Sequence, residues 1–530
     1  MSIGTRRALL EGYVETIRTM PTIQFPENTQ AASRRKTPSK TLAKIDRILK
    51  KVFGLAELRP GQRSVIEAVL NNEHTLAIMP TGAGKSLCYQ IPALLMPGMT
   101  VVVSPLIALM RDQFDKLSAL GLDAVQINSA VGAIDVRHAR TRINRQSVEF
   151  IFTTPEQLAS GDLRERLASG AVDLVVIDEA HCISHWGHDF RPAYLEAIAT
   201  LRAQTSPTFL ALTATAPPEV IEDIAIQLGV GPLRVFNTGL HRPNLSYQVR
   251  PVSSDADKQR QLVELVRAGT GAAIVYAGTV RHVDALAQVC RQEGIEAVSY
   301  HGRMRARDRA ESQDKFMSGS TSLIIATNAF GMGIDKPDIR AVIHYDLPAS
   351  LDVYYQESGR AGRDGESADC TLLFQRRDRR LQTFFMAGRY PTHGDFATLI
   401  AGLRSVDSAR ALTLTELRAA VPAISTAKLR VMLTVLKQEG RIRERRGPRY
   451  EVRPQLFTEP FENFARHYEE RRERDRSKLE QMVVFAQTSL CRTRLMLEAL
   501  GEDVAWSECG TCDNCRGEAI RAAAIASGAA

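Results

Sequence analysis

Short apolar runs alternate with longer amphipathic segments in the first half of the chain. From residue 41 onward the apolar runs are TLAIM, TVVVSP, VEFIFTT, DLVVIDEA and TFLALTATA. Each run has the length of one strand, and the segment after it carries apolar residues at helical spacing. Buried strands that alternate with helices are typical of a parallel sheet covered on both faces. We therefore expect an α/β lobe over residues 40–238.

A second series of the same kind follows. Its apolar runs are AAIVYAGT, EAVSYHG, TSLIIATN, AVIHYDLP and CTLLF, again with helical patterns between them. This series predicts a second α/β lobe over residues 239–390, joined to the first near residues 236–245.

The pattern changes after the second series. The next segment reads as two helices and a tight hairpin, with a capping-box pattern at Thr413 and Glu416. Helices followed by an arginine-rich hairpin that turns at Gly447 and Pro448 are found in winged-helix modules and also in other small helical domains. Both interpretations stay open for residues 391–455.

The rest of the chain divides into one further module and two tails. Residues 456–517 read as mainly helical and end in a cluster of cysteines. Residues 1–39, which end in SRRKTPSK, and residues 518–530 are expected to be tails outside the packed domains. The predicted fold class is α/β, with two parallel-sheet lobes followed by a helical or winged-helix-like module and a cysteine-bearing helical module.

Composition excludes several classes of protein. The 530 residues suffice for three or four domains, with an ordinary globular balance of 44% hydrophobic and 24% charged residues. No apolar run approaches the roughly 20 residues that a membrane-spanning helix requires, and the N-terminal stretch lacks a secretory apolar core. We therefore expect a soluble cytoplasmic protein, associated with the nucleoid if the source is bacterial, and no membrane partner.

The net charge of +8 suits a polyanionic partner but is modest for a chain of this length. Positive charge is most concentrated in one short stretch that contains Arg441, Arg443, Arg445, Arg446 and Arg449. A solvated basic turn and a phosphate-binding patch explain this cluster equally well.

The sequence PTGAGKS follows the first apolar run and precedes a helical segment. Glycines let backbone amides close around phosphate oxygens at the start of a helix. We expect Lys85 to reach the β- and γ-phosphates of ATP and Ser86 to hold Mg²⁺. The loop that binds the nucleotide would comprise Thr81, Gly82, Gly84, Lys85 and Ser86. Met79 stands where the strict pattern has glycine.

Two adjacent carboxylates follow the apolar run DLVVI. The carboxyl end of a parallel strand is the place where such groups meet a ligand. We assign Asp178 to Mg²⁺ and Glu179 to activation of the attacking water.

In the second lobe, YYQESGRAGRDG places Arg360 and Arg363 one turn apart on an expected helix. Guanidinium groups there suit the charge that develops on a transferred phosphoryl group.

Four cysteines near the C-terminus have the spacing of a metal site. A single cysteine precedes the run CGTCDNC, so that the set is Cys491, Cys509, Cys512 and Cys515. Four soft ligands favour tetrahedral Zn²⁺ in a closed structural site, while four reduced and unpaired thiols are the alternative.

With these motifs in order, residues 45–390 resemble the RecQ family of superfamily-2 DNA helicases. The resemblance runs through FGLAELRPGQ, VSPLIALMRDQ, TTPEQL, LTATA, YHGRM and TNAFGMGIDKPDIRAVIHYDLP. It implies RecA-like lobes, and it implies that Arg59 and Gln62 contact adenine. KLEQMVVFAQTSLCRTRLMLEALGE before the cysteine run is similar to the zinc module of the family. Leu55 stands where the family often has an aromatic residue.

The segment HCISHWGHDFRPAY looks like the aromatic-rich loop of RecQ proteins. By this resemblance, Trp186, Phe190 and Arg191 couple binding of a single strand to ATP hydrolysis, and Ser104 of VSPLIALMRDQ belongs with them. His185 stands where the family often has glutamine. The family's zinc module usually follows the motor closely, with a winged helix after it, whereas here about 90 residues intervene.

The expected function is that of an ATP-dependent 3′-to-5′ DNA helicase acting on single-stranded and forked DNA in repair or recombination, with ATP, Mg²⁺ and Zn²⁺ as cofactors. Two alternatives remain. One is an RNA helicase or a translocase that does not unwind, and the other is a zinc and winged-helix protein that binds nucleic acid with a vestigial ATPase. Protein partners are not predicted by any motif.

Overall fold

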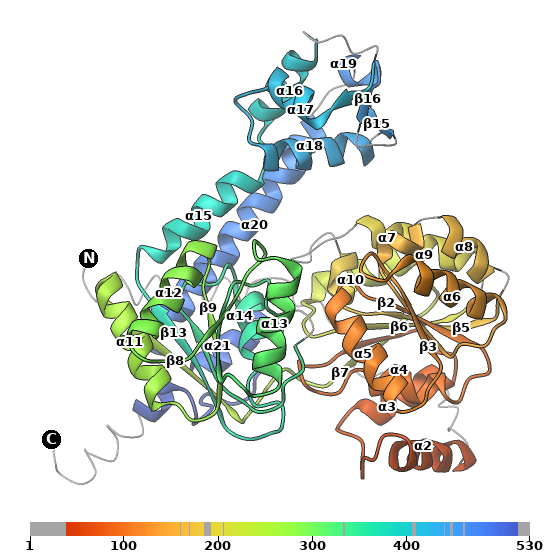
Figure 1. Ribbon diagram of the computed structural model, residues 1–530, viewed down its shortest axis with the longest axis horizontal. Helices are drawn as coiled ribbons and strands as arrows, with labels where there is room; N and C mark the ends of the chain where they lie inside the picture. Colours follow the sequence, from red (N-terminus) through yellow and green to blue (C-terminus); the bar gives the residue numbers. More distant parts are fainter. Residues whose placement is uncertain are drawn as a thin grey trace. The chain divides into compact units, whose positions relative to one another are not determined.

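The structure is a computed structural model that describes residues 39–159, 161–168, 170–184, 192–204, 206–331, 334–404, 410–438, 440–445, 449–458 and 462–517. The chain divides into two compact units, one built mainly from residues up to Thr238 and the other mainly from Gly239 onward. Figure 1 colours the first unit from red to yellow and the second from green to blue.

The first unit contains a seven-stranded parallel sheet in the order β3-β4-β2-β5-β6-β1-β7. The strands are β1 (Thr75–Ile78), β2 (Met99–Val103), β3 (Ala124–Ile127), β4 (Phe150–Thr153), β5 (Val172–Ile177), β6 (Thr208–Thr213) and β7 (Arg234–Asn237). The five strands expected from apolar runs are all present. The four-residue strands β3 and β7 were not expected, because neither stands out as an apolar run and β7 is largely exposed.

Helices connect these strands, as parallel pairing requires. They are α2 (Ser39–Lys51), α3 (Gln62–Leu70), α4 (Leu87–Ala93), α5 (Ile107–Ala119), α6 (Ala133–Asn144), α7 (Pro155–Ala159), α8 (Gly161–Ala168), α9 (Pro192–Gln204) and α10 (Pro218–Leu228), with a 3₁₀ turn η1 (Ala180–Ile183). The register pairs Ile177 of β5 with Val103 of β2. The residues that follow these strands therefore lie at one edge of the sheet.

The second unit contains a six-stranded parallel sheet in the order β10-β11-β9-β12-β13-β8. The strands are β8 (Leu245–Pro251), β9 (Ala272–Tyr276), β10 (Val298–Tyr300), β11 (Leu323–Ala326), β12 (Ile339–His344) and β13 (Ala368–Phe374). The helices are α11 (Asp255–Ala268), α12 (Val280–Gln292), α13 (Ala306–Met317) and α14 (Leu351–Ser358). Strand β8 was not expected, because it alternates buried and partly exposed residues at the edge of the sheet.

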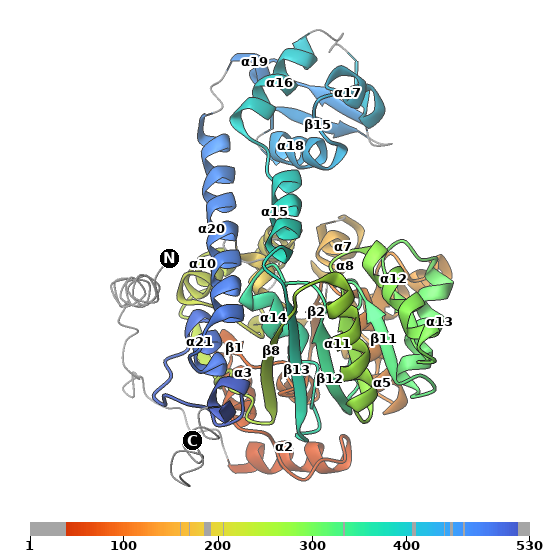
Figure 2. The same ribbon diagram turned by 90° about the vertical axis from the view of Figure 1, so that its left-hand side faces the viewer.

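Two long helices follow the second sheet. Helices α15 (Asp378–Arg389) and α20 (Glu462–Gln487) lie side by side in both views (Figures 1 and 2). Between them in sequence lie α16 (His393–Arg404), β14 (Leu412–Thr413), α17 (Leu414–Ala420), α18 (Thr426–Gln438), β15 (Ile442–Arg445), β16 (Arg449–Val452) and α19 (Gln455–Thr458). These elements form a small module inserted between the two arms of a helical hairpin.

The inserted module is winged-helix-like. Its three-stranded antiparallel sheet, in the order β14-β16-β15, shares one apolar core with α16, α17 and α18. The capping box expected at the start of α17 is confirmed, since Thr413 and Glu416 exchange both hydrogen bonds. The expected turn at Gly447 and Pro448 lies outside the described residues.

The described chain ends with α21 (Arg492–Ala499) and the cysteine run after it. The fold class expected from the sequence is confirmed: two RecA-like parallel-sheet lobes are followed by a winged-helix-like module and a cysteine-bearing helical module. Among the helices of the described residues, none combines the length and apolar character needed to cross a bilayer.

Candidate functional site

The phosphate loop connects β1 to α4. Gly82 and Gly84 have φ of 84° and 75°, a left-handed conformation that glycine adopts without steric cost. Ala83 N donates to Pro80 O at 3.1 Å, and α4 begins directly after Lys85 and Ser86. The loop thus has the backbone geometry that anion binding at the start of a helix requires.

Gln62 fixes the phosphate loop from the side. Its Nε2 donates to Gly84 O at 2.8 Å, and its Oε1 accepts from Arg59 N at 2.8 Å. A Cβ on residue 84 would lie 2.6 Å from this Nε2 and would displace the amide, and the φ of 75° also favours glycine there. The amide of Gln62 is therefore bound to backbone in this structure. The expected contact of Arg59 and Gln62 with adenine stays a prediction.

Asp178 follows β5 and is held from two sides. Its Oδ2 accepts a hydrogen bond from Ser104 Oγ at 3.0 Å, and its backbone O accepts one from the hydroxyl of Tyr194 at 2.9 Å. Burial and the neighbouring Glu179 raise the pKa of Asp178, while the charge of Lys85 opposes this rise. Ser104 is only 1% exposed, so its side chain faces the carboxylate rather than solvent.

Glu179 has an unusual backbone conformation for a residue other than glycine. Its φ of 50° and ψ of 51° lie in the left-handed region, which costs free energy and is found most often at functional sites. Its Oε2 is buried and accepts no hydrogen bond from the described residues. The imidazole of His181 is close to it, with Nδ1 3.4 Å away.

His181 links the carboxylates to the segment LTATA. Its Nδ1 lies 3.1 Å from Thr213 Oγ1, and that hydroxyl donates its only proton to Thr215 O at 2.9 Å. Thr213 must therefore accept from His181, which places a proton on Nδ1. The position of Glu179 is in this way tied to the end of β6.

The residues present fit ATP and Mg²⁺. Carboxylate and hydroxyl oxygens are the ligands that Mg²⁺ prefers, and Asp178 and Ser86 provide them. The buried Oε2 of Glu179 has acceptor capacity left for a water molecule. Lys85 is close enough to Asp178 to lower its pKa. The structure thus groups the carboxylates, Ser104 and Lys85 that the sequence singled out.

The aromatic-rich segment is described only at its two ends. Trp186, Phe190 and Arg191 lie outside the described residues, as does His185. Before them, Ser184 Oγ donates to Asp223 Oδ2 of α10 at 2.8 Å. After them, the hydroxyl of Tyr194 donates to the backbone O of Asp178 at 2.9 Å. Neither Ser184 nor Tyr194 was predicted from the sequence. Each hydroxyl bonds to a group far away along the chain, and such a contact has no local sequence motif.

The arginine pair of the second lobe is not helical, so that expectation was wrong. Helix α14 ends at Ser358, and Arg360 and Arg363 lie in the turns that follow, where Gly362 has a φ of 55°. The reason is a competing set of hydrogen bonds. Arg242 Nη2 donates to Gly362 O at 2.7 Å, and Asn244 Nδ2 donates to the same oxygen at 2.8 Å.

Arg242 and Asn244 hold the arginine loop over more than one residue. Arg242 also donates to Ala361 O at 3.1 Å, and Asn244 to Glu366 O at 2.9 Å. Neither was predicted from the sequence, where the only signal is the polar run HRPN at the junction of the two strand series. Both are positioning residues for the loop.

Arg363 pairs with an acidic residue of its own lobe. Its Nη1 lies 2.8 Å from Asp335 Oδ1, and burial lowers its pKa. The Nε atoms of Arg360 and Arg363 are both buried without a hydrogen-bond partner among the described residues. Two guanidinium groups with unused donors are thus held on one loop. Asp335 lies in the segment GMGIDKP and was not singled out from the sequence.

The four cysteines form one cluster. The Sγ atoms of Cys491, Cys509, Cys512 and Cys515 all lie within 4.8 Å of one another. Backbone and hydroxyl donors surround one of them, since Cys512 N and Thr493 Oγ1 donate to Cys509 Sγ at 3.3 and 3.2 Å. Four thiolates at this spacing fit tetrahedral Zn²⁺, and every ligand position of a closed structural site is filled.

The cysteine run packs on the edge of the second sheet. Asp513 Oδ2 accepts from Val249 N of the edge strand β8 at 2.9 Å, and Ser246 Oγ donates to Thr511 O at 2.9 Å. Arg492 Nε lies 2.6 Å from the other oxygen of Asp513. The cluster therefore covers an open sheet edge and orders it.

The hairpin of the winged-helix-like module has one basic face. The register of β15 and β16 pairs Arg443 with Glu451 and Arg445 with Arg449. Residues paired in this way point to the same side of a sheet, as do alternate residues along a strand. Glu451 binds Arg445 through both Nε and Nη2 at 2.7 Å. Arg443 lies across from the same carboxylate and helps to lower its pKa, so that one acidic group faces three arginines on this side.

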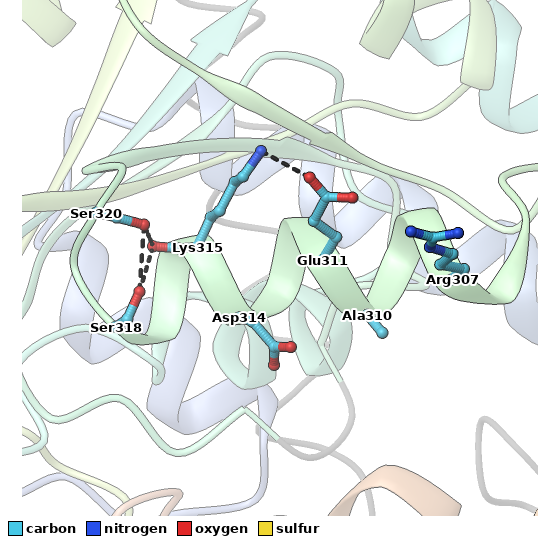
Figure 3. Close-up of a pocket in the computed structure, with 7 residues that line it drawn as sticks. All are labelled: Arg307, Ala310, Glu311, Asp314, Lys315, Ser318 and Ser320. Carbon is cyan, nitrogen blue, oxygen red and sulfur yellow. Dashed lines mark hydrogen bonds and ion pairs between the residues drawn. The ribbon is translucent and has the colours of Figure 1, made fainter.

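A shallow hollow along α13 lies apart from these sites (Figure 3). It is lined by Arg307, Ala310, Glu311, Asp314, Lys315, Ser318 and Ser320. Its polar groups bond mainly to one another: Lys315 Nζ lies 2.9 Å from Glu311 Oε1, and Ser320 Oγ donates to Lys315 O at 2.9 Å. No functional role follows from this surface.

Known families match three stretches of the chain. The DEAD/DEAH box helicase family matches residues 59–224, the helicase conserved C-terminal domain matches residues 257–365, and the RecQ zinc-binding family matches residues 455–516. The last match contains all four clustered cysteines and supports Zn²⁺ as the metal that they bind.

Two proteins of Bacillus subtilis illustrate the similarity. The ATP-dependent DNA helicase RecQ is 41% identical over 342 residues, which are 64% of this chain and 57% of the relative. The probable ATP-dependent DNA helicase RecS is 37% identical over 368 residues, which are 69% of this chain and 74% of the relative. This chain belongs to the RecQ family. The resemblance found in the sequence is thereby confirmed.

The chain spans 54–57% of the length of three relatives that it matches: the B. subtilis RecQ and two Caenorhabditis proteins, each named putative ATP-dependent DNA helicase Q1. The activity, substrates and partners of those whole proteins are therefore proposals for this RecQ-family chain. Among solved structures, the Mycobacterium smegmatis helicase Lhr bound to ssDNA and AMP-PNP has a TM-score of 0.53 at 23% identity, covering 78% of this chain and 60% of the other. At this identity the likeness concerns the fold alone.

Proposed function

We propose that this chain is an ATP-dependent DNA helicase that moves along a single strand in the 3′-to-5′ direction and unwinds duplex DNA. The observation that carries the proposal is the carboxylate pair at the end of β5. Asp178 is oriented by Ser104 at 3.0 Å, and Glu179 keeps a buried oxygen without a donor. Such a pair beside a phosphate loop suits hydrolysis of a nucleoside triphosphate.

Each residue of the first lobe has a separate role. The backbone amides of the loop from Thr81 through Gly82 and Gly84 cradle phosphate oxygens, and Lys85 neutralises the β- and γ-phosphates. Ser86 and Asp178 would hold Mg²⁺, which supplies charge neutralisation on the phosphates when bound. Arg59 and Gln62 would contact the adenine.

Glu179 orients and deprotonates the attacking water through its buried Oε2. His181 lies beside this carboxylate, with its Nδ1 3.4 Å from Oε2, and its ring is fixed by Thr213. Movement of β6 or of its following segment would therefore change the position of the base. This is one route by which nucleic-acid binding can alter the rate of hydrolysis.

Arg360 and Arg363 stabilise the charge that develops on the transferred phosphoryl group. For this, Arg363 exchanges its pairing with Asp335 for phosphate oxygens, which requires the two lobes to close on ATP. An arginine in this role contributes about 10³-fold or more to kcat. Opening after hydrolysis restores the pairing with Asp335.

The nucleic acid is proposed to be single-stranded and forked DNA, bound with help from Trp186, Phe190 and Arg191. Support comes from the curated relatives, which are named DNA helicases. The basic hairpin face with Arg443 and Arg449 supplies a second contact, to phosphates of the duplex. We infer action in repair or recombination, in the cytoplasm or at the nucleoid.

The domain bounds are proposed as residues 40–238 and 239–390 for the two lobes, 391–455 for the winged-helix module and 456–517 for the zinc module. Lobes with these bounds each contain one whole parallel sheet. Limited proteolysis should cut first near these bounds.

Two assays test the function together. ATP hydrolysis is measured without nucleic acid, with single-stranded DNA and with RNA, and unwinding is followed on duplexes that carry a 3′ or a 5′ tail. DNA should stimulate hydrolysis, and the 3′-tailed duplex should be unwound. The Lys85→Ala variant should bind DNA but not hydrolyse ATP. Stimulation by RNA alone, or activity retained in Lys85→Ala, would overturn the proposal.

A further inference from the structure

Helix α15 exposes two neighbouring phenylalanines. The side chain of Phe384 is 73% exposed and that of Phe385 is 41% exposed, and their ring centroids lie 6.2 Å apart. Phenylalanine is among the residues most often buried, so an exposed pair marks a surface that awaits a partner. The helix begins four residues after β13, at the carboxyl end of that strand, and runs beside α20 (Figure 2).

The side of α15 opposite Phe384 is anchored, which fixes the rotation of the helix. Asp378 in its first turn is buried and accepts from Lys258 Nζ at 2.8 Å. Gln382 Nε2 donates to Leu347 O at 2.6 Å, and Arg379 pairs with Glu480 of α20. These contacts use the side of the helix that faces the second lobe and α20. The anchors therefore hold Phe384 outward, while Phe385 lies at the edge of the anchored side, in keeping with its lower exposure of 41%.

The same surface carries positive charge without a counter-charge. Arg376 and Arg380 are exposed, and in the described part of the chain neither of them pairs with a carboxylate. Arg380 lies one helical turn before Phe384, so the two side chains share a face. Arg377, in contrast, is paired with Asp255. One exposed guanidinium group lies a helical turn from an exposed ring, and a second lies just before the start of the helix, which favours a partner that is both anionic and aromatic.

We propose that Arg376, Arg380, Phe384 and Phe385 form a docking surface for single-stranded DNA, distinct from the aromatic-rich segment of the first lobe. Bases stack on the rings, and phosphates pair with the guanidinium groups. An acidic peptide satisfies the charges but seldom provides flat rings in succession, whereas every nucleotide provides one ring and one charge. The inference rests on the proposed function in so far as DNA is the nucleic acid bound.

The test measures binding of a fluorescein-labelled oligo-dT to the full chain without nucleotide, by anisotropy. The Phe384→Ala/Phe385→Ala double variant should raise Kd about tenfold or more, because the bases lose the rings on which they stack. A Phe384→Leu/Phe385→Leu variant keeps apolar area but no ring and should also bind weakly. The Arg380→Ala variant should reduce the slope of log Kd against log salt by about 0.7.

Controls separate this surface from general effects. Ile226, which is 73% exposed on α10, is the matched apolar position, and Ile226→Ala should leave Kd unchanged. All variants should keep the wild-type thermal transition and the rate of ATP hydrolysis without DNA. An exposed apolar face can also bind a second copy of the chain. Sedimentation of the wild type and of the double alanine variant measures whether such a dimer forms.

Three outcomes overturn the inference. If the wild type and the double alanine variant bind DNA with equal Kd, the docking surface is refuted and the helicase proposal still stands. No DNA binding by the wild type removes both. A dimer that the alanine variant dissociates assigns the surface to self-association instead.

Discussion

The hydroxyl of Tyr194 donates to the backbone carbonyl of Asp178 at 2.9 Å, and the tyrosine ring is wholly buried. Tyr194 lies in the first turn of α9 and is the last residue of the aromatic-rich segment, three residues after Arg191. One hydrogen bond thus connects the expected nucleic-acid segment with the expected Mg²⁺ ligand. This gives a short physical path from DNA binding to the hydrolytic site.

The Tyr194→Phe variant should lose the hydrogen bond to Asp178 and keep the packing of the ring. Loss of one hydrogen bond of about 1 kcal/mol predicts a fall of about fivefold in kcat for DNA-stimulated hydrolysis, with a smaller change in KM for ATP. Tyr354→Phe is the matched control, because Tyr354 is a buried tyrosine of the second lobe. An equal fall in both variants would show a general effect of hydroxyl loss.

Ser104 was expected to contact DNA or to couple it to hydrolysis, and its hydroxyl bonds to Asp178 at 3.0 Å. The Ser104→Ala variant should therefore lower the rate of hydrolysis several-fold while leaving the Kd for single-stranded DNA unchanged. Steady-state ATPase assays and anisotropy on the same preparation measure both. Weakened DNA binding with normal hydrolysis would instead assign Ser104 to the DNA surface.

Removal of zinc should destabilise the edge of the second sheet. Cys512 is fully buried in the cluster, so Cys512→Ser should lose bound zinc and lower Tm by several degrees. Cys290→Ser is the control, because Cys290 is buried outside the cluster. Metal content and Tm are measured on both. A Tm unchanged by loss of zinc would contradict a structural role for the cluster.

His282 should titrate above its ordinary pKa. Its Nδ1 lies 2.6 Å from Asp346 Oδ2, and this carboxylate raises the pKa of His282, against the opposing effects of burial and of Lys258. NMR should show the midpoint of this histidine above 6.5 in the wild type and lower in Asp346→Asn. The resonance is assigned by its loss in His282→Gln. Equal midpoints in wild type and Asp346→Asn would contradict the pairing.

The sign of the stability effect follows from this shift. A raised folded-state pKa gives stability that is fully present below about pH 6.5 and is lost as pH rises through the folded-state value. Because the side chain of His282 is 40% exposed, the effect should stay under about 1 kcal/mol. Urea unfolding of wild type and His282→Gln should differ at pH 5.5 and converge toward pH 8.5.

The basic hairpin face should bind duplex phosphates. The Arg443→Ala/Arg449→Ala variant should weaken binding of forked DNA and reduce the slope of log K against log salt by about 2. Arg260→Ala is the control, because Arg260 is exposed but paired with Asp257. Hydrolysis without DNA should not change. An unchanged salt slope would indicate a solvated turn, the alternative that the sequence left open.

The phosphate loop, the carboxylate pair and the cysteine cluster were predictable because each is local. Gly82 to Ser86 and Asp178 to Glu179 are contiguous after apolar strands, and three of the four cysteines lie within seven residues. The residue types and their spacing within each motif are therefore enough to predict what the motif binds. The order of strands along the chain also predicted both sheets.

The remaining contacts join residues far apart in sequence. Arg242 holds the loop of Gly362 across 120 residues, and this competition ends α14 at Ser358 where the local pattern favoured more helix. Tyr194 reaches a backbone carbonyl, which no side-chain pattern records. The edge strands β7 and β8 are partly exposed and lack the apolar runs of central strands. Such features depend on tertiary structure and not on local propensity.

A structure of the chain with a non-hydrolysable ATP analogue, Mg²⁺ and a 3′-tailed duplex tests the central claim most directly. If ATP drives closure of the two lobes, Lys85 Nζ and the guanidinium group of Arg363 should both contact the terminal phosphate, and Arg363 should have left Asp335. An analogue bound by Lys85 alone, with Arg363 still paired to Asp335 at about 2.8 Å, would contradict it.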